Sequence, residues 1–295
     1  MIKKNSPQAW LLATRPKTLA ASATPVIIAC ALAYHDKSFQ WKPALICLLF
    51  ALIAQIISNF ANDYFDYKKG IDNEERLGPK RTVAEGWIAP SVMLSVTIAL
   101  LALDLALGLL LLHYGGWKLI FVGLLVAVFA FAYSGGPYPL AYHGWGDVCV
   151  FVFFGIIPVV FTYYVQTLQW SIPAAICGMS AGLVIINILV ANNYRDRFSD
   201  AKSGKKTSIV LFGEKFGSWF YLLNGIIAVV GCQYFWLEKS GCWAALLPLI
   251  YLVFHILTWK EMVAICQGKA LIRTLEKSAR NVLIFGATLS AGLIF

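Results

Sequence analysis

The sequence predicts an all-α membrane protein, built as a bundle of transmembrane helices. Of its 295 residues, 59% are hydrophobic and only 13% are charged, whereas soluble domains are about 45–50% apolar and about 25% charged. The mean hydropathy is +0.71. Long apolar runs recur along the whole chain, and most approach the roughly 20 residues that cross a bilayer as a helix. This composition excludes a soluble globular enzyme, a disordered chain and a disulfide-stabilised scaffold.

Nine apolar runs are predicted to be spans. In chain order they cover residues 18–34, 41–64, 90–112, 119–133, 146–165, 172–192, 217–237, 243–262 and 279–295. Polar or turn-forming residues separate each run from the next. No linker, low-complexity tract or shift in composition divides the chain, so we expect a single transmembrane domain over residues 1–295.

The Lys and Arg residues predict the orientation of these spans. The segments before the first span and after the second, fourth, sixth and eighth spans hold four, five, none, six and five of them, where the last count includes Lys260 and Arg280 at the ends of the adjoining spans. The opposite side holds only four of the 24, at Lys37, Lys42, Lys118 and Lys239. Because positive residues are retained on the cytoplasmic side, we expect the N-terminus inside and the C-terminus outside. The basic charge then needs no nucleic-acid partner, and anionic lipid headgroups and an anionic substrate remain as candidates.

Two cytoplasmic connections, 65–89 and 193–216, are expected to be long loops, and a stripe of Asn and Asp residues spans the start of each. The first stripe is formed by Asn59, Asn62, Asp63 and Asp66. The second is formed by Asn192, Asp196 and Asp200. On a helix the members of each stripe share one face. A carboxylate at the bilayer centre costs about 2.5–3.5 kcal/mol, and two unpaired clusters at one depth repel each other, so a positive group is expected between them.

Mg²⁺ fits this requirement, because it takes oxygen ligands from one or two carboxylates together with substrate phosphates. The chain offers no matching set of His and Cys residues, which disfavours Zn²⁺. Both loops also carry Lys and Arg residues that would neutralise a departing diphosphate. A diphosphate site at the end of apolar helices indicates an isoprenoid diphosphate, whose tail belongs in the lipid.

At these residues the sequence resembles the UbiA-type intramembrane aromatic prenyltransferases, and the resemblance extends over essentially the whole chain. That superfamily carries two Asp-rich motifs at the ends of the second and sixth helices of a nine-helix bundle. Asn62-x-x-x-Asp66 matches the start of the first motif, and Asp196-x-x-x-Asp200 matches the second.

The usual third acid of the first motif is missing, because Gly70 occupies its position and Asp72 follows two residues later. This displacement is similar to the branch that prenylates 1,4-dihydroxy-2-naphthoate in menaquinone biosynthesis. Segments 15–19, 76–81, 137–147 and 192–196 also resemble that branch.

The resemblance implies the transfer of a polyprenyl group from polyprenyl diphosphate to 1,4-dihydroxy-2-naphthoate, with loss of CO₂ and diphosphate and with two Mg²⁺ ions. The implied metal ligands are Asn62, Asp63, Asp66, Asp72, Asn192, Asp196 and Asp200. The implied diphosphate-binding residues are Asn62, Lys17, Arg76, Arg81 and Lys205. The implied catalytic residues are Asp66, Asp72, Asp196, Asp200 and Tyr138, and Tyr138 and Asp147 would border the acceptor. The implied location is the inner membrane of a bacterium, surrounded by lipid, with the active site facing the cytoplasm.

Two alternatives stay open. The same fold could prenylate another ring, such as 4-hydroxybenzoate or homogentisate. A cation-coupled transporter would instead use carboxylates at the membrane midplane, but the two stripes lie at span ends and only Asp104 lies near the middle of a span. For Asp104 we expect a hydrogen-bond partner inside the bundle.

Overall fold

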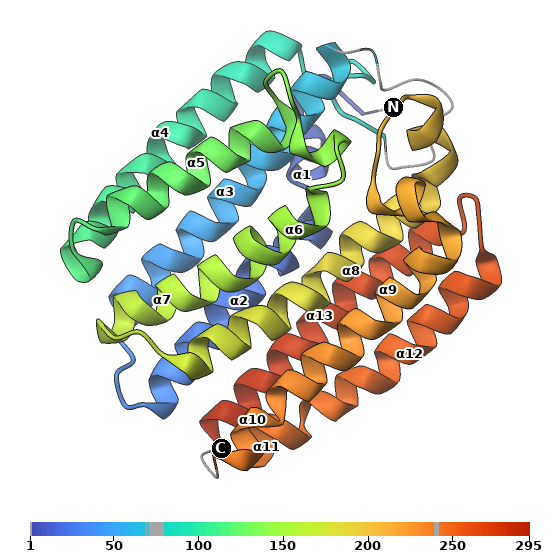
Figure 1. Cartoon of the computed structure of the whole chain (residues 1–295). Coiled ribbons are helices and arrows are strands. Elements are labelled where there is room, and N and C mark those ends of the chain that lie inside the picture. The colour runs from blue at the N-terminus through green and yellow to red at the C-terminus, as the bar shows by residue number, and fades with distance from the viewer. Residues whose placement is uncertain (1, 69, 71–79, 239–241) are drawn as a thin grey trace.

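The computed structural model describes residues 2–68, 70, 80–238 and 242–295 of the chain. Every regular element within these ranges is a helix. The long helices run side by side as one bundle, and the C-terminal ends of α3 (Trp41–Lys68) and α8 (Ile172–Lys202) lie at the same end of it (Figure 1). We refer to this end as the motif end.

The remaining elements follow in chain order. They are α1 (Pro7–Thr14), α2 (Pro16–His35), α4 (Pro90–Gly115), α5 (Leu119–Ser134), η1 (Leu140–Tyr142), α6 (Gly146–Phe151), η2 (Val152–Ile156), α7 (Ile157–Thr167), α9 (Ser208–Cys232), α10 (Tyr234–Leu237), α11 (Cys242–Leu246), α12 (Pro248–Ile265) and α13 (Leu271–Ile294). α6, η2 and α7 form one long helix interrupted by a π turn.

Seven helical segments in the described part of the chain are long and apolar enough to cross a membrane. They are Thr18–His35, Trp41–Lys68, Pro90–Gly115, Gly146–Thr167, Ile172–Lys202, Ser208–Leu237 and Cys242–Ile265. The other two predicted spans, 119–133 and 279–295, fall on α5 and α13. α5 has only 16 residues, and the first half of α13 carries Arg273, Lys277 and Arg280. The count of nine spans and their orientation therefore stay predictions.

Local sequence explains where several of these helices begin. Pro occupies the first turn of α2, α4, α8 and α12, where its missing N–H costs no hydrogen bond. The side chains of Ser171 and Thr207 cap α8 and α9 by accepting from the backbone N–H groups of Ala174 and Val210.

The expectation of a long loop over residues 193–216 is wrong. α8 continues as a helix to Lys202, and α9 begins at Ser208. The predicted span ended at Asn192 because the apolar run ends there, but a helix ends where its backbone hydrogen bonds end. In this case that point is set by Gly204, which has φ +75°, a conformation that glycine adopts at little cost. The second stripe therefore lies on a rigid helix.

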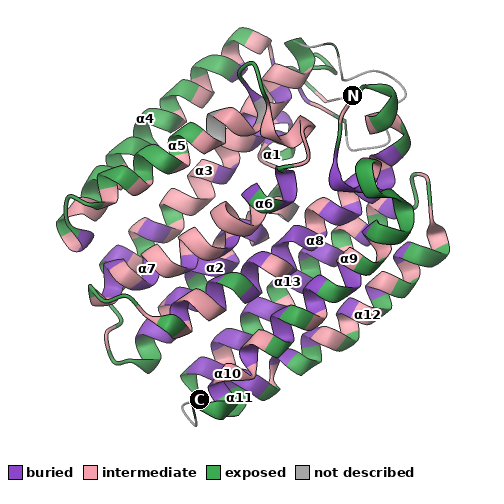
Figure 2. Ribbon diagram, viewed as in Figure 1, coloured by how far each residue is buried: buried purple, intermediate pink, exposed green. Residues whose placement is uncertain are grey.

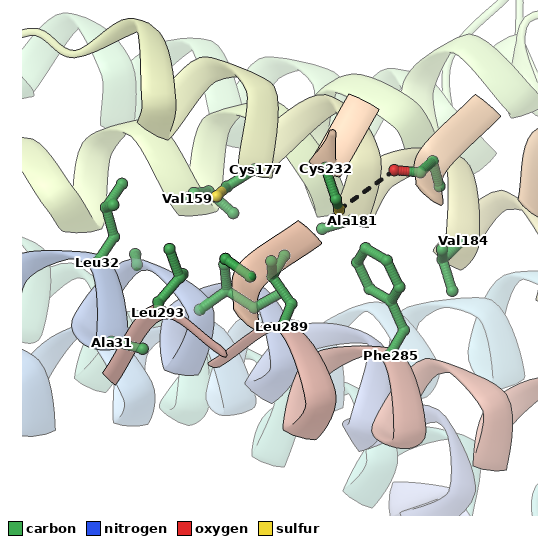
Figure 3. Packing of buried hydrophobic residues seen from close by; sticks show 14 of the residues in the cluster. Ala31, Leu32, Val159, Cys177, Ala181, Val184, Cys232, Phe285, Leu289 and Leu293 are labelled. Atoms are coloured by element: carbon green, nitrogen blue, oxygen red, sulfur yellow. Dashed lines mark hydrogen bonds between the residues drawn. The ribbon is translucent and has the colours of Figure 1, made fainter. Parts of the chain in front are cut away.

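α8 is the central helix of the bundle, and α4 and α5 are peripheral. Buried residues are concentrated along α8, α2 and α13, whereas α4 and α5 are mostly exposed (Figure 2). Side chains from α2, α7, α8, α9 and α13 meet in one apolar cluster, in which the Cys232 Sγ donates to the Ala228 carbonyl at 3.3 Å (Figure 3).

Two glycines allow the π-bulged helix to pack directly against α8. A Cβ atom added at Gly155 would overlap the Cα of Gly182, and it would lie 2.7 Å from the Gly178 carbonyl oxygen. The obstacles are backbone atoms, which cannot move aside as a flexible side chain would. This close approach holds the α6–α7 helix against the helix that carries the second motif.

Gly155→Ala is therefore expected to destabilise the protein by about 1–3 kcal/mol, as overpacking of a dense interface does. The measurement is the thermal unfolding midpoint of the purified protein in detergent. Gly123→Ala on α5 is the matched control, because a Cβ there meets nothing within 4 Å and alanine favours the helix. Equal midpoints for the two variants would contradict the packing argument.

Candidate active site

A cavity of about 1510 Å³ lies between α2, α3, α4, α5, α7 and α8. It extends from Asp66 and Asp200 at the motif end to Leu119 and Val165 near the opposite end, and most of its wall is apolar. Both stripes line its polar end. The lining residues from the stripes are Asn59, Asn62, Asp63, Asp66, Asn192, Asp196 and Asp200. The fold therefore brings the two motifs, far apart in sequence, to one chamber.

The first motif is held by the segment that follows it. The Arg81 Nη2 donates to Asp66 Oδ2 at 2.8 Å. Asp63 is 2% exposed, and its Oδ2 accepts from Thr82, from the backbone N–H at 3.1 Å and from Oγ1 at 2.6 Å. Val83 then packs with Phe60 in an apolar cluster. These contacts anchor Arg81 over the end of α3.

Asn59 serves the fold rather than a ligand. Its Nδ2 donates to the Thr14 carbonyl at 2.9 Å and to Thr18 Oγ1 at 3.1 Å. Its Oδ1 accepts from Gln55 Nε2 at 3.2 Å, and Gln55 in turn accepts from Ser22. Because these bonds join α3 to α1 and α2, Asn59 positions the start of α2 beside the cavity.

The second motif contains a buried arginine. Arg195 is 2% exposed; its Nε donates to Asp196 Oδ1 at 2.7 Å, and its Nη2 donates to Asp196 Oδ2 at 2.6 Å and to Asn192 Oδ1 at 2.8 Å. One turn further on, Asp200 forms an ion pair with Lys205 at 3.5 Å. Lys205 follows Gly204 in the short connection to α9, so the tight turn brings the ammonium group back to α8.

A positive group was expected between the two stripes, and the structure places protein cations at three of the acids: Asp66 and Asp196 each pair with an arginine, and Asp200 pairs with Lys205. The hydrogen bonds from Thr82 to Asp63 hold Arg81 next to the end of α3. Arg195 lies beside Asp196 on the same helix. Neither ion pair can be predicted from the number of charged residues in each loop. Positive groups are already present at these acids, so charge repulsion by itself does not require a metal.

The residues nevertheless fit Mg²⁺. Asp63 Oδ1 and Asp200 Oδ2 are buried and have no hydrogen-bond partner among the described residues, and both side chains line the cavity. The available donors are oxygen atoms, which Mg²⁺ prefers. Within the described ranges no three His, Cys, Asp or Glu side chains form a ready-made metal cluster.

Arg197 fixes the direction of the end of α8. Its buried guanidinium donates from Nη1 to the carbonyls of Tyr194 at 2.7 Å and Cys266 at 2.8 Å, and from Nη2 to Glu214 Oε2 at 2.7 Å. These bonds join α8 to α9 and to the end of α12. Arg197 thereby restrains the turns that carry Asp196 and Asp200.

The two residues expected at the acceptor have different surroundings. Tyr138 is 54% exposed, and its ring stacks on His143 with centroids 3.7 Å apart. Asp147 is buried and lines a small cavity of about 20 Å³ together with Tyr133 and Ser208. Tyr133 also lines the large cavity, so its side chain borders both cavities.

Several expected site residues lie outside the part of the chain that the structure describes. Asp72 and Arg76 fall within residues 71–79, and the side chain of Lys17 is also outside. Other residues line the polar end of the cavity but were not among the candidates. These are Arg15, Tyr133, Tyr142 and Asn193. Their proximity to the motifs depends on helix packing, although Asn193 stands directly between the residues of the second motif in sequence.

Residues 22–267 match the UbiA prenyltransferase family. The chain belongs to this family. It is 34% identical to 1,4-dihydroxy-2-naphthoate octaprenyltransferase of Escherichia coli, over 94% of both chains. It is 31% identical to the Mycobacterium tuberculosis protein of the same name, over 97% of both chains. The resemblance seen in the motifs is thus confirmed, and the protein is a multi-pass membrane prenyltransferase.

Solved structures of the UbiA family share this fold. A UbiA homologue from Aeropyrum pernix K1 superposes with a TM-score of 0.67 at 16% identity, covering 90% of this chain and 96% of that one. A UbiA homologue from Archaeoglobus fulgidus, bound to GPP and Mg²⁺, superposes with a TM-score of 0.62 at 16% identity, covering 96% and 99%. The all-helical architecture is therefore the UbiA fold.

Proposed function

We propose that the protein transfers a polyprenyl group from polyprenyl diphosphate to 1,4-dihydroxy-2-naphthoate, releasing diphosphate and CO₂ and forming the hydroquinone form of demethylmenaquinone. The observation that supports this most directly is the joint contribution of both Asp motifs to the polar end of one largely apolar cavity. The bacterial relatives named for this acceptor support the choice of ring.

The polar end of the cavity suits a diphosphate. Arg81 and Lys205 line it from the two motif connections, and charge-assisted hydrogen bonds from such groups bind phosphate oxygens well. Asp66, Asp196 and Asp200 would hold two Mg²⁺ ions, with Asn62, Asp63 and Asn192 beside them. When bound, Mg²⁺ neutralises the negative charge that develops on the departing diphosphate. Asp72, Arg76 and Lys17 remain part of the proposed site.

The apolar part of the cavity suits the tail and the reacting carbon. The C–O bond to the diphosphate breaks, and its electron pair leaves with the diphosphate oxygen. Phenyl faces along the wall stabilise the allylic cation, and the apolar surroundings exclude water that would capture it. The ring carbon that bears the carboxyl group then bonds to the allylic carbon. The carboxyl group leaves as CO₂, and its bonding electrons return to the ring.

The acceptor would enter between the 137–147 segment and the cavity, bordered by Tyr138 and Asp147. We further propose nine spans in a single domain, with the N-terminus inside, the C-terminus outside and the motif end facing the cytoplasm of a bacterium. The concentration of Lys and Arg on that side supports this orientation. Exposed leucines on α4 that do not line the cavity, such as Leu103 and Leu110, support contact with membrane lipid.

The proposal is tested by incubating membranes that contain the protein with Mg²⁺, a polyprenyl diphosphate and one acceptor at a time. We expect a prenylated naphthol and CO₂ with 1,4-dihydroxy-2-naphthoate, and no product in membranes lacking the protein. Product only with 4-hydroxybenzoate or homogentisate would overturn the choice of acceptor and keep the reaction class. Movement of an ion or solute without release of diphosphate would favour the transporter instead.

A further inference from the structure

Asp104 is an acid of the cavity wall that belongs to neither motif. It lies on α4 and lines the cavity with Leu101, Leu105 and Gly108, which share its helix face. The residue is 7% exposed, and its Oδ1 has no hydrogen-bond partner in the described ranges. The expected partner inside the bundle is therefore not found there.

Helix geometry gives the depth of Asp104 below the first motif. A Cβ atom at Gly108 would touch the Phe50 ring at 3.5 Å, so Gly108 of α4 lies level with Phe50 of α3. Asp66 lies 16 residues further along α3, which is about 24 Å at 1.5 Å per residue. Asp104 is one helical turn closer to the motif end than Gly108. Its carboxyl group is thus about 18 Å along the bundle from the level of Asp66.

The surroundings at that depth are apolar. Phe129 of α5 and Phe153 of the π turn line the cavity, and their ring centroids are 4.7 Å apart. Leu119, ten residues before Phe129, touches the Cβ position of Gly115 at the far end of α4, which places Phe129 near the level of Asp104. Contact with these rings makes the binding free energy of a hydrocarbon chain more favourable. Contact with a carboxyl group makes it less favourable, because the chain covers a polar group without offering a hydrogen bond.

We propose that Asp104 is a specificity-determining residue that limits how deeply a prenyl tail enters the cavity and so sets the preference for donor length. This inference rests on the proposed function, because it requires the diphosphate to lie at Asp66 and Asp196. A geranyl group held there is too short to reach Asp104 even when fully extended. An octaprenyl group is long enough to pass it, and its terminal units meet the carboxyl group unless they turn away.

The test compares geranyl diphosphate with octaprenyl diphosphate as donors to 1,4-dihydroxy-2-naphthoate. Asp104→Leu is expected to raise the octaprenyl-to-geranyl ratio of kcat/KM by about tenfold, since an apolar side chain removes the cost of covering the carboxyl group. Turnover of geranyl diphosphate stays unchanged. Asp104→Asn keeps the shape and a polar group, so its ratio lies between those of the wild type and the leucine variant.

Leu103→Ala is the control for a general disturbance of α4, because Leu103 is exposed and lies off the cavity face; its ratio equals that of the wild type. An unchanged ratio in both Asp104 variants, with geranyl transfer retained, would overturn the inference and leave the proposed function intact. An equal loss of kcat/KM with both donors would show that Asp104 has a structural role, and it would also overturn the inference. If Asp104→Leu does not fold, the octaprenyl-to-geranyl ratio of kcat/KM measured for Asp104→Asn decides whether the inference holds. Absence of transfer by the wild type with either donor would instead refute the proposed function.

Discussion

Asp66→Asn and Asp196→Asn are each expected to lower prenyl transfer by about a hundredfold to a thousandfold, the scale seen when a group that stabilises developing charge is removed. The amide has nearly the same size as the carboxylate but carries no negative charge for a divalent cation. Its oxygen can still accept the hydrogen bond from Arg81 at 2.8 Å, or one of the two from Arg195 at 2.6–2.7 Å, while Arg195 also keeps its bond to Asn192. The loss is therefore expected in turnover rather than in folding.

Glu85→Gln is the matched control for these variants. Glu85 lies in the segment that carries Arg81, and it forms a surface ion pair with Lys80 at 2.8 Å, an interaction that contributes little to stability. Its variant should retain full turnover. The measurements are initial rates with 1,4-dihydroxy-2-naphthoate and the thermal midpoint of each purified variant. Near-normal turnover in either Asp variant would show that its carboxylate does not hold the metal.

Removal of divalent cations is expected to abolish turnover completely, and added Mg²⁺ should restore it. Without the cation, a diphosphate entering the polar end meets the carboxylates of Asp66, Asp196 and Asp200, while Arg81 and Arg195 remain engaged with two of them. The acids then repel the substrate instead of binding it. EDTA saturated with Mg²⁺ beforehand is the control, and it should leave the rate unchanged.

A second readout separates binding from chemistry. An unreactive diphosphate analogue should raise the thermal midpoint only when Mg²⁺ is present, because a ligand that binds the folded state and not the unfolded state stabilises the protein. A dependence of rate on free Mg²⁺ steeper than first order would support two ions. Full turnover in EDTA, or equal stabilisation with and without Mg²⁺, would contradict a metal-dependent site.

Much of the bundle could be predicted from local sequence, because hydrophobic length and proline position act within one helix. The starts of α3, α4 and α8 agree with the predicted spans. The ends were less accurate, since the end of an apolar run marks where a helix leaves the membrane and not where its hydrogen bonds stop. Residues 193–202, expected as loop, therefore form the last turns of α8.

The membrane class, the family and the two Asn/Asp stripes were determined by the sequence alone, because each depends on composition or on spacing along a single helix. Tertiary structure decided which partner each acid has and which space it lines. Arg81 reaches Asp66 only because Thr82 docks on Asp63, and the motifs share a chamber only because α3 and α8 border the same gap. Asp104 has no hydrogen-bond partner among the described residues for the same reason, since contacts between distant helices depend on how all of them pack together.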